Sequence, residues 1–213
     1  MRGERVWLFD LDNTLHNASP HIFPHINRAM REYIERYLGL DENAANRLRQ
    51  DYWQRYGATL LGLIRHHAID PRHFLHETHQ FPDLARMLVF EKPLLHTLKR
   101  LPGRKILFSN APRAYAEAVL ELTGLDRHFA AVYTVESLKF RPKPMPQGFR
   151  TLLRAEKLDP RRCIMVEDSL DNLITARKLG MKTVWVSTGS RRSPYVNVQV
   201  SSVLQLPQRC ARL

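Results

Sequence analysis

Short, mostly apolar runs alternate with amphipathic segments along most of this chain, and that alternation limits the folds it can adopt. Apolar runs bounded by polar sequence are typical of buried strands, and the apolar spacing between them is helical. Apolar strands separated by helices indicate a parallel sheet that is covered on both faces. The predicted strands are residues 6–9, 105–108, 130–133, 163–166 and 183–186, with a weaker edge strand at 196–200.

The segment after the first strand is helical throughout. Asp41 and Asp70 each precede a helical pattern as N-caps, and a proline follows Asp70 in the first turn. We therefore predict an α/β fold: residues 1–15 and 91–213 form a Rossmann-like, parallel-sheet catalytic core, and residues 16–90 form a helical cap inserted after the first strand. The residues expected on one face of its first helix are Ile26, Met30, Tyr33, Ile34 and Tyr37.

Charge is unevenly distributed along the chain. The 213 residues include 33 basic and 21 acidic side chains, for a formal net charge of +12. Residues 16–90 contain nine arginines, no lysine and eight acidic residues, so the positive excess lies in the predicted core. The basic residues are scattered and form no recognised nucleic-acid motif, which favours a small phosphorylated or otherwise anionic substrate over nucleic acid.

Three further features of the sequence bear on the cellular compartment of the protein. Two cysteines are too few for a disulfide framework. The longest apolar runs are too short to cross a membrane, and the first residues lack the apolar stretch of a secretion signal. We therefore expect a cytoplasmic protein without a membrane partner. The oligomeric state stays open.

Polar side chains follow three of the predicted strands. Asp10 and Asp12 come after the first strand, Ser109 and Asn110 after the second, and Asp168 after the fourth. Because ligands gather at the carboxyl ends of parallel strands, we expect these side chains to converge. Carboxylates that lie close together bind a cation or become protonated, and oxygen ligands favour Mg²⁺. We therefore expect Asp10, Asp12 and Asp168 to hold Mg²⁺.

This set of residues supports phosphoryl transfer. In an extended backbone, Asp10 and Asp12 point to the same side, which suits a nucleophile beside a general acid/base. Lys143, from the long loop before residue 146, and Mg²⁺ would keep Asp10 ionised beside a phosphate. Ser109 and Asn110 would bind the phosphoryl oxygens. Taken alone, Ser109 and the acidic pair at 167–168 also fit helix caps, and Lys143 fits a surface lysine.

The motifs DLDNT, FSN, KPMP and VEDS, in that order, resemble the four motifs of the haloacid dehalogenase-like phosphohydrolase superfamily. This resemblance implies a nucleophile at Asp10, an acid/base at Asp12, a phosphate-binding hydroxyl at Ser109, the lysine at Lys143 and a metal ligand at Asp168. Members that cleave carbon–halogen bonds lack the second carboxylate of the first motif. Asp12 therefore indicates a phosphatase. The resemblance leaves open whether Glu167, Asp171 or Asn172 supports the metal.

Residues 51–63 resemble a narrower group, the pyrimidine 5'-nucleotidases, in which a Tyr-Gly-x-Thr-Leu-x-Gly-Leu stretch recurs. The resemblance implies UMP or CMP as the substrate, bound by Tyr56 and His16, although members usually carry tyrosine where this chain has His16. Glycine inside a helix costs about 1 kcal/mol relative to alanine. Gly57 and Gly62 therefore predict a turn or close packing.

We therefore predict a Mg²⁺-dependent phosphatase that acts through an aspartyl-phosphate on a pyrimidine nucleoside 5'-monophosphate. The alternative enzyme is a phosphatase or mutase for a sugar phosphate or phosphoglycolate, with the same core and a different cap. A non-catalytic binding module is the third hypothesis. The complete set of Asp10, Asp12, Lys143 and Asp168 argues against it, because a binding module needs no acid/base.

Overall fold

The computed structural model describes residues 5–210 and residue 213. The chain divides into two compact units. The core unit contains residues 1–17 and 89–213, and the helical unit contains residues 18–88. These bounds differ by two residues at each junction from the division expected from the sequence.

A parallel sheet of six strands, counted over the described residues, forms the centre of the core unit. Its strand order is β3-β2-β1-β4-β5-β6, and every neighbouring pair runs parallel. The predicted α/β class with a parallel sheet is confirmed. The strands are β1 (Val6–Phe9), β2 (Arg104–Phe108), β3 (Ala131–Tyr133), β4 (Cys163–Glu167), β5 (Lys182–Val186) and β6 (Val198–Val200).

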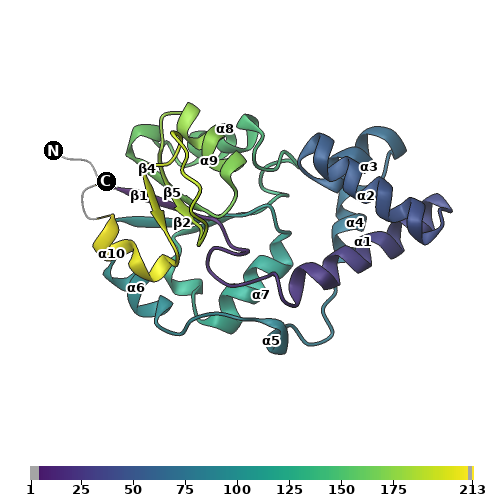
Figure 1. Cartoon of the computed structure of the whole chain (residues 1–213), viewed down its shortest axis with the longest axis horizontal. Coiled ribbons are helices and arrows are strands. Elements are labelled where there is room, and N and C mark those ends of the chain that lie inside the picture. The colour runs from purple at the N-terminus through teal and green to yellow at the C-terminus, as the bar shows by residue number, and fades with distance from the viewer. Residues whose placement is uncertain (1–4, 211–212) are drawn as a thin grey trace. The chain divides into compact units, whose positions relative to one another are not determined.

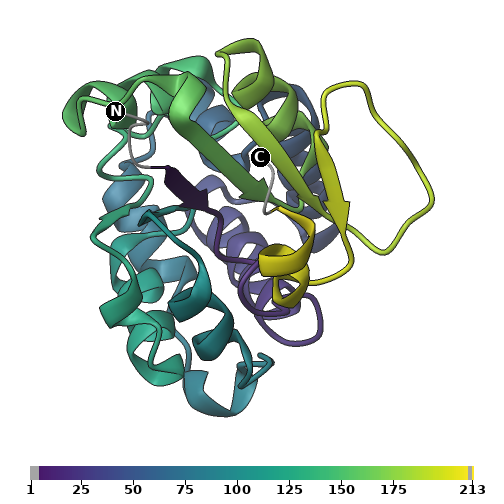
Figure 2. The ribbon, with the colours of Figure 1, turned by 90° about the vertical axis from the view of Figure 1, so that its left-hand side faces the viewer.

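Helices cover both faces of this sheet (Figures 1 and 2). Figure 1 shows α8 and α9 on one face and α6, α7 and α10 on the other. On the first face, Phe149 and Leu152 of α8 and Leu173 of α9 pack against Leu8 and Phe108 from the strands. The helices are α6 (Leu94–Arg100), α7 (Arg113–Thr123), α8 (Pro146–Ala155), α9 (Leu170–Lys178) and α10 (Leu206–Arg209), with 3-10 turns at Asp126–His128, Pro160–Arg162 and Val203–Gln205.

Two helices of the helical unit begin directly after the N-cap residues that the sequence predicts. The Asp41 carboxylate accepts a hydrogen bond from the amide of Ala44 at 2.8 Å. The Asp70 carboxylate accepts one from the amide of Arg72 at 2.7 Å, and Pro71 occupies the first helical position. Both predicted caps are therefore present. The helices are α1 (Ile22–Leu38), α2 (Glu42–Tyr56), α3 (Thr59–His67), α4 (Pro71–Thr78) and α5 (Leu84–Met87).

The predicted apolar face of α1 is only partly buried. Ile26, Tyr33 and Ile34 are buried, but Tyr37 is 44% exposed. The Tyr37 ring lies against Tyr33, with centroids 4.3 Å apart, and its hydroxyl is 3.3 Å from Nε2 of His73 on α4. Tyr37 therefore lies at the edge of the buried face, where its polar end stays near water.

The two glycines in residues 51–63 are required for different structural reasons. Gly57 ends α2 in the left-handed region, at φ 79°, which glycine adopts without strain. Gly62 lies inside α3, where a Cβ would come within 2.2 Å of Cγ of Tyr52. One glycine therefore makes a turn, and the other allows two helices to pack closely.

The helical unit leaves and rejoins the core at neighbouring points. The amide of Asn17 donates to the carbonyl oxygen of Val89 at 2.7 Å. The insertion thus begins soon after β1, the strand that immediately precedes Asp10. Among the described residues, no helix combines the length and apolar character needed to cross a membrane.

Candidate active site

The site lies at the carboxyl ends of three adjacent central strands. Asp10 follows β1, Ser109 follows β2, and Glu167 is the last residue of β4. The strands β2, β1 and β4 are neighbours in the sheet, so parallel pairing places their ends side by side. All three side chains belong to the core unit and are buried.

Lys143 lies between two buried carboxylates. Its Nζ is 2.6 Å from Oδ1 of Asp10 and 2.7 Å from Oε2 of Glu167, and the side chain is 1% exposed. The same ammonium lies 5.2 Å from the ring centroid of Phe108, within range of a cation–π contact. Lys143 is therefore a buried charge with matched partners and not a surface lysine.

Burial perturbs the protonation of this cluster. Burial, together with the charge of Glu167, raises the pKa of Asp10 from 3.8 to about 7. Burial also raises the pKa of Glu167 from 4.5 to about 7, although Lys143 opposes that rise. Burial alone would lower the pKa of Lys143, but the two carboxylates outweigh it and the net shift is upward. The lysine thus stays charged, while the positive charge near the two carboxylates is too small to cancel the effect of burial on their pKa values.

Asp168 adds a third carboxylate to the same group. Oxygens of Asp10, Glu167 and Asp168 lie within 4.8 Å of one another. Burial, followed by the charge of Asp10, raises the pKa of Asp168. The indole of Trp185 donates to the main-chain oxygen of Asp168 at 2.8 Å and so fixes the backbone there. This donor set consists entirely of oxygen, the preference of Mg²⁺.

The side chain of Asp12 lies outside that group of carboxylates. Its Oδ1 accepts a hydrogen bond from the Tyr115 hydroxyl at 2.7 Å and lies 2.9 Å from Nε2 of His16. The metal set expected from the sequence, Asp10, Asp12 and Asp168, therefore differs from the observed carboxylate group, in which Glu167 replaces Asp12. Asp12 instead makes its contacts with Tyr115 and His16, and its role as a metal ligand stays a prediction.

Ser109 and Asn110 make contacts within the protein itself. Oγ of Ser109 accepts a hydrogen bond from the amide of Ala111 at 3.0 Å, as in a turn. The side chain of Asn110 forms two hydrogen bonds with the main chain of Lys143. In this structure, the Asn110 side chain therefore positions the lysine. On α9, Asn172 is buried and Asp171 is exposed.

The structure places the two residues predicted to bind the nucleoside in different units. His16 belongs to the core unit, and its side chain is fully buried against Asp12. Tyr56 belongs to the helical unit, where its hydroxyl lies 2.6 Å from Nε2 of His66. Arg65 lies over the Tyr56 ring at 5.7 Å. Each residue thus has partners inside its own unit.

Sequence reasoning missed Tyr115 and the pairing of Glu167 with Lys143. Tyr115 is the third residue of α7, the helix that follows the second strand, so its place at the strand ends was a usable signal. Thr14 was missed as well, although it belongs to the first motif; its hydroxyl donates to Oδ2 of Asp10 at 3.3 Å.

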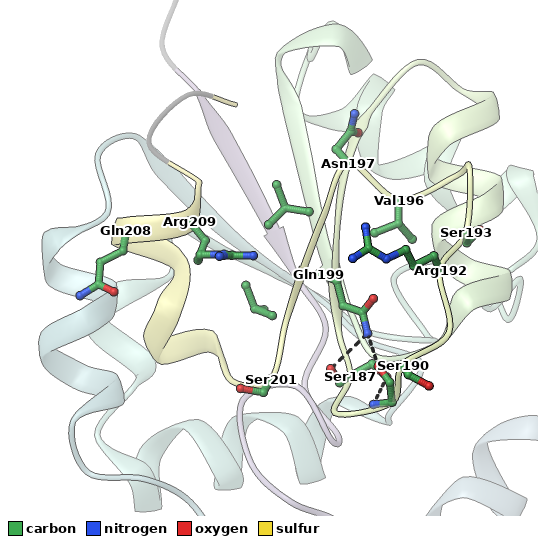
Figure 3. A pocket seen from close by; sticks show the side chains of 13 residues that line it. Ser187, Ser190, Arg192, Ser193, Val196, Asn197, Gln199, Ser201, Gln208 and Arg209 are labelled. Carbon is green, nitrogen blue, oxygen red and sulfur yellow. Dashed lines mark hydrogen bonds between the residues drawn. The ribbon is translucent and has the colours of Figure 1, made fainter.

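Two cavities lie in the core unit. One, of about 640 Å³, has Asp168 and His16 in its wall together with the polar side chains of Thr14, Thr188 and Ser202. The other, of about 850 Å³, lies along edge strand β6 and is lined by Arg192, Arg209 and several serines (Figure 3). None of the three clustered carboxylates lines this second cavity.

Curated relatives of this chain include phosphatases. Phosphate metabolism protein 8 of Saccharomyces cerevisiae is 26% identical over 194 residues, which cover 84% of this chain and 60% of that protein. The chain thus spans less than two thirds of that relative. A phosphoglycolate phosphatase of Rhodospirillum rubrum is 29% identical over 218 residues, covering 92% of this chain and 85% of the relative.

Solved structures and a family model agree on the fold. The crystal structure of CbbY from Rhodobacter sphaeroides in complex with phosphate has a TM-score of 0.68 and 18% identity, with 96% of each chain covered. At that identity the likeness concerns the fold alone. The family model of haloacid dehalogenase-like hydrolases matches residues 5–180, which is most of the chain and includes every residue of the site. The chain belongs to the haloacid dehalogenase-like hydrolase family.

Proposed function

We propose that this protein is a Mg²⁺-dependent phosphatase that hydrolyses phosphate monoesters through an aspartyl-phosphate on Asp10. The observation that carries the proposal is the buried Lys143 ammonium, 2.6 Å from Asp10 and 2.7 Å from Glu167. A buried ammonium between carboxylates holds a nucleophilic carboxylate in place and supplies positive charge where a phosphate dianion would approach. The phosphatase names of several relatives support the same reaction.

The residues present fit a divalent cation. Asp10, Glu167 and Asp168 bring three carboxylates together around one ammonium, which leaves an excess of negative charge. Burial is the first cause of the raised pKa values of Asp10 and Glu167, and repulsion from Glu167 on Asp10 and from Asp168 on Glu167 adds to it. Asp10 and Asp168 would hold the ion, with Glu167 as a ligand or as the partner of Lys143. When bound, Mg²⁺ supplies charge that offsets the phosphate and keeps Asp10 ionised.

The reaction then has two steps. A carboxylate oxygen of Asp10 attacks phosphorus, the new oxygen–phosphorus bond forms, and the bond to the leaving oxygen breaks as Asp12 donates its proton to that oxygen. Asp12, now ionised, takes a proton from water as the water attacks the aspartyl-phosphate. Cleavage of the bond between phosphorus and Asp10 releases inorganic phosphate and restores both carboxyl groups.

Positioning falls to the neighbouring residues. Asn110 fixes the main chain at Lys143, so the ammonium reaches the nucleophile from a defined direction. The Ser109 hydroxyl keeps its hydrogen while accepting from Ala111, and that hydrogen would donate to a phosphoryl oxygen. Thr14 fixes the second oxygen of Asp10.

For the substrate, we propose a pyrimidine nucleoside 5'-monophosphate such as UMP or CMP. Support comes from residues 51–63, whose Tyr-Gly-x-Thr-Leu-x-Gly-Leu stretch resembles that of pyrimidine 5'-nucleotidases. Gly62 in that stretch has a packing role against Tyr52, so part of the resemblance reflects helix packing.

Phosphoglycolate or a sugar phosphate is the second candidate substrate. This candidate is supported by the names of relatives whose sequences match this chain over most of their length. Among them are the phosphoglycolate phosphatases of Mesorhizobium japonicum and Rhodospirillum rubrum. The cavity beside Asp168 has the hydroxyl groups of Thr14, Thr188 and Ser202 in its wall, among apolar side chains, and these hydroxyl groups would suit a small hydroxylated leaving group.

A phosphate-release screen tests both levels of the proposal. UMP, CMP, AMP, phosphoglycolate and hexose phosphates would be compared at equal concentration, with Mg²⁺ and with chelator, using Asp10→Asn as the blank. We expect Mg²⁺-dependent release that exceeds the blank, with the highest kcat/KM for UMP or CMP. A preference for phosphoglycolate would replace the substrate but keep the reaction. No release from any ester would reject the phosphatase.

A further inference from the structure

Asp12 is held by two side chains that are far apart in the sequence. The Tyr115 hydroxyl, on α7, donates to Oδ1 of Asp12 at 2.7 Å. Nε2 of His16 lies 2.9 Å from the same oxygen and 3.2 Å from the Tyr115 hydroxyl. The three polar groups therefore form a closed triangle within the core unit.

The two carboxylate oxygens of Asp12 have different surroundings. Tyr115 is 3% exposed, and the His16 side chain is fully buried. The side chain of Asp12 is 18% exposed. Both contacts are made to Oδ1, and no residue in the described part of the chain forms a hydrogen bond with Oδ2. Oδ2 is thus the oxygen of Asp12 that remains for substrate and water.

The His16 ring is held in this place at a cost. Its Nδ1 is buried and has no hydrogen-bond partner among the described residues. With Nε2 against a carboxylate oxygen, we assign the hydrogen to Nε2 and the bare lone pair to Nδ1. A buried polar atom without a partner is unfavourable and calls for an explanation. The contact of Nε2 with Asp12 provides one.

We propose that Tyr115 and His16 are positioning residues that fix Asp12 through Oδ1, so that Oδ2 exchanges the proton with the leaving oxygen and then with water. This inference rests on the proposed function, because it assigns the acid/base role to Asp12. Two donors on one oxygen stop rotation of the carboxyl group, and correct geometry is a large part of what an acid/base contributes.

The test compares two leaving groups. p-Nitrophenolate leaves without a proton, whereas an alkoxide requires one, so a misplaced acid affects only the alkyl ester. We would measure kcat/KM for p-nitrophenyl phosphate and for the alkyl monoester that the parent turns over fastest. Because Tyr115→Phe removes one of the two donors that orient Asp12, it should lower kcat/KM for the alkyl ester by about 10- to 100-fold. The value for p-nitrophenyl phosphate should change by less than about threefold, since the remaining machinery is intact.

Histidine variants give a rescue experiment. His16→Leu removes the nitrogen beside Oδ1 and should show the same selective loss. His16→Gln offers an amide nitrogen close to the place of Nε2 and should recover most of the alkyl ester activity. The matched control is Tyr133→Phe, which removes a hydroxyl that donates to Glu156 at 2.6 Å, outside the site. It should leave the ratio between the two esters unchanged.

Asp12→Asn separates failure of this inference from failure of the function. If Asp12→Asn loses the alkyl ester selectively while Tyr115→Phe and His16→Leu lose both esters equally or neither, the positioning role is overturned and the acid role of Asp12 stands. If Asp12→Asn itself lacks the selectivity, the acid role falls, and the inference falls with it. Melting temperatures of all variants identify any uniform loss that comes from unfolding.

Discussion

The side-chain amide of Asn110 forms two hydrogen bonds with the main chain of Lys143. Nδ2 donates to the Lys143 carbonyl oxygen at 2.9 Å, and Oδ1 accepts from the Lys143 amide at 2.8 Å. Asn110 follows β2, so this pair connects a loop 33 residues further along the chain to the central strands. The contact explains how a lysine from a long loop reaches the end of β1 in a defined position.

Asn110→Ala should therefore lower kcat more than it raises KM. Both hydrogen bonds are lost and the Lys143 ammonium is no longer held against Asp10, while the rest of the phosphate site is intact. Misplacement of about 1 Å can cost about 100-fold in rate. Steady-state kinetics measure the effect. Asn110→Asp keeps the acceptor and loses the donor, so its kcat should fall between those of the alanine variant and the parent.

Asp10→Asn should give a folded protein without turnover. Asparagine has nearly the same shape, but its amide is a poor nucleophile and cannot form the aspartyl-phosphate. Circular dichroism would check the fold, and phosphate release the activity. Release within tenfold of the parent would contradict the assignment of Asp10 as the nucleophile.

Lys143→Met should lower both activity and stability. Removing one partner of a buried ion pair typically costs about 3–5 kcal/mol, because the remaining charge is left without compensation. Here two carboxylates, on Asp10 and Glu167, would be left. Urea unfolding in chelator measures the loss. Lys178→Met, at an exposed position of α9, is the matched control and should change the free energy of unfolding by less than about 0.5 kcal/mol.

Removal of divalent metal should make stability fall as pH rises. Burial raises the pKa of Asp10 from 3.8 and that of Glu167 from 4.5, each to about 7. The folded protein therefore binds these protons more tightly than the unfolded chain, and this stabilising contribution, fully present below the unfolded values, is lost as pH rises to about 7. The slope is about 1.4 kcal/mol per pH unit for each proton.

Urea unfolding at pH 5, 6 and 7 in chelator would measure that slope. Glu167→Gln removes one of the titrating groups and should reduce the slope. Of the three pH values, Mg²⁺ should raise stability most at pH 7, where the largest fraction of the carboxylates is ionised. In activity assays Mg²⁺ should restore turnover better than Ca²⁺, which takes more ligands at longer distances. Equal slopes in the parent and in Glu167→Gln would show that the buried carboxylates do not control the effect.

Gly62→Ala should destabilise the helical unit. Alanine gains about 1 kcal/mol in helix propensity, but its Cβ would lie 2.2 Å from Cγ of Tyr52, and such overpacking typically costs about 1–3 kcal/mol. At that distance the clash should exceed the gain. The same substitution in a Tyr52→Leu background should cost less, because the ring is gone. A stabilised single variant would mean that the helices separate readily.

The core of this fold could be predicted because the apolar pattern of each strand and the alternation of strands with helices indicate the same parallel sheet. β1 is apolar at every position and buried at every position, and its bounds at Val6 and Phe9 match the expected strand. Parallel pairing then brings the residues after neighbouring strands together, which is why Asp10 and Asp168 meet. The α/β class followed from the alternation of strands and helices alone.

Contacts between distant side chains could not be predicted. Tyr115 lies 103 residues from Asp12, and although its place in the first turn of α7 puts it near the strand ends, the sequence does not show which side chain it contacts. The contact of His16 with Asp12, four residues earlier, was not foreseen, and its contact with a nucleoside stays a prediction. The pairing of Lys143 with Glu167 required knowledge of how the loop after β3 returns to the sheet.

The hydrogen bond between Asn17 and Val89 has an evolutionary consequence. Because the two ends of residues 18–88 meet at one point of the core, the whole helical unit can be gained, lost or exchanged by a single insertion or deletion, without breaking the sheet or moving Asp10. Asp10 is encoded before that stretch and Lys143 and Glu167 after it, so a change confined to the helical unit leaves the codons of the buried charged cluster untouched.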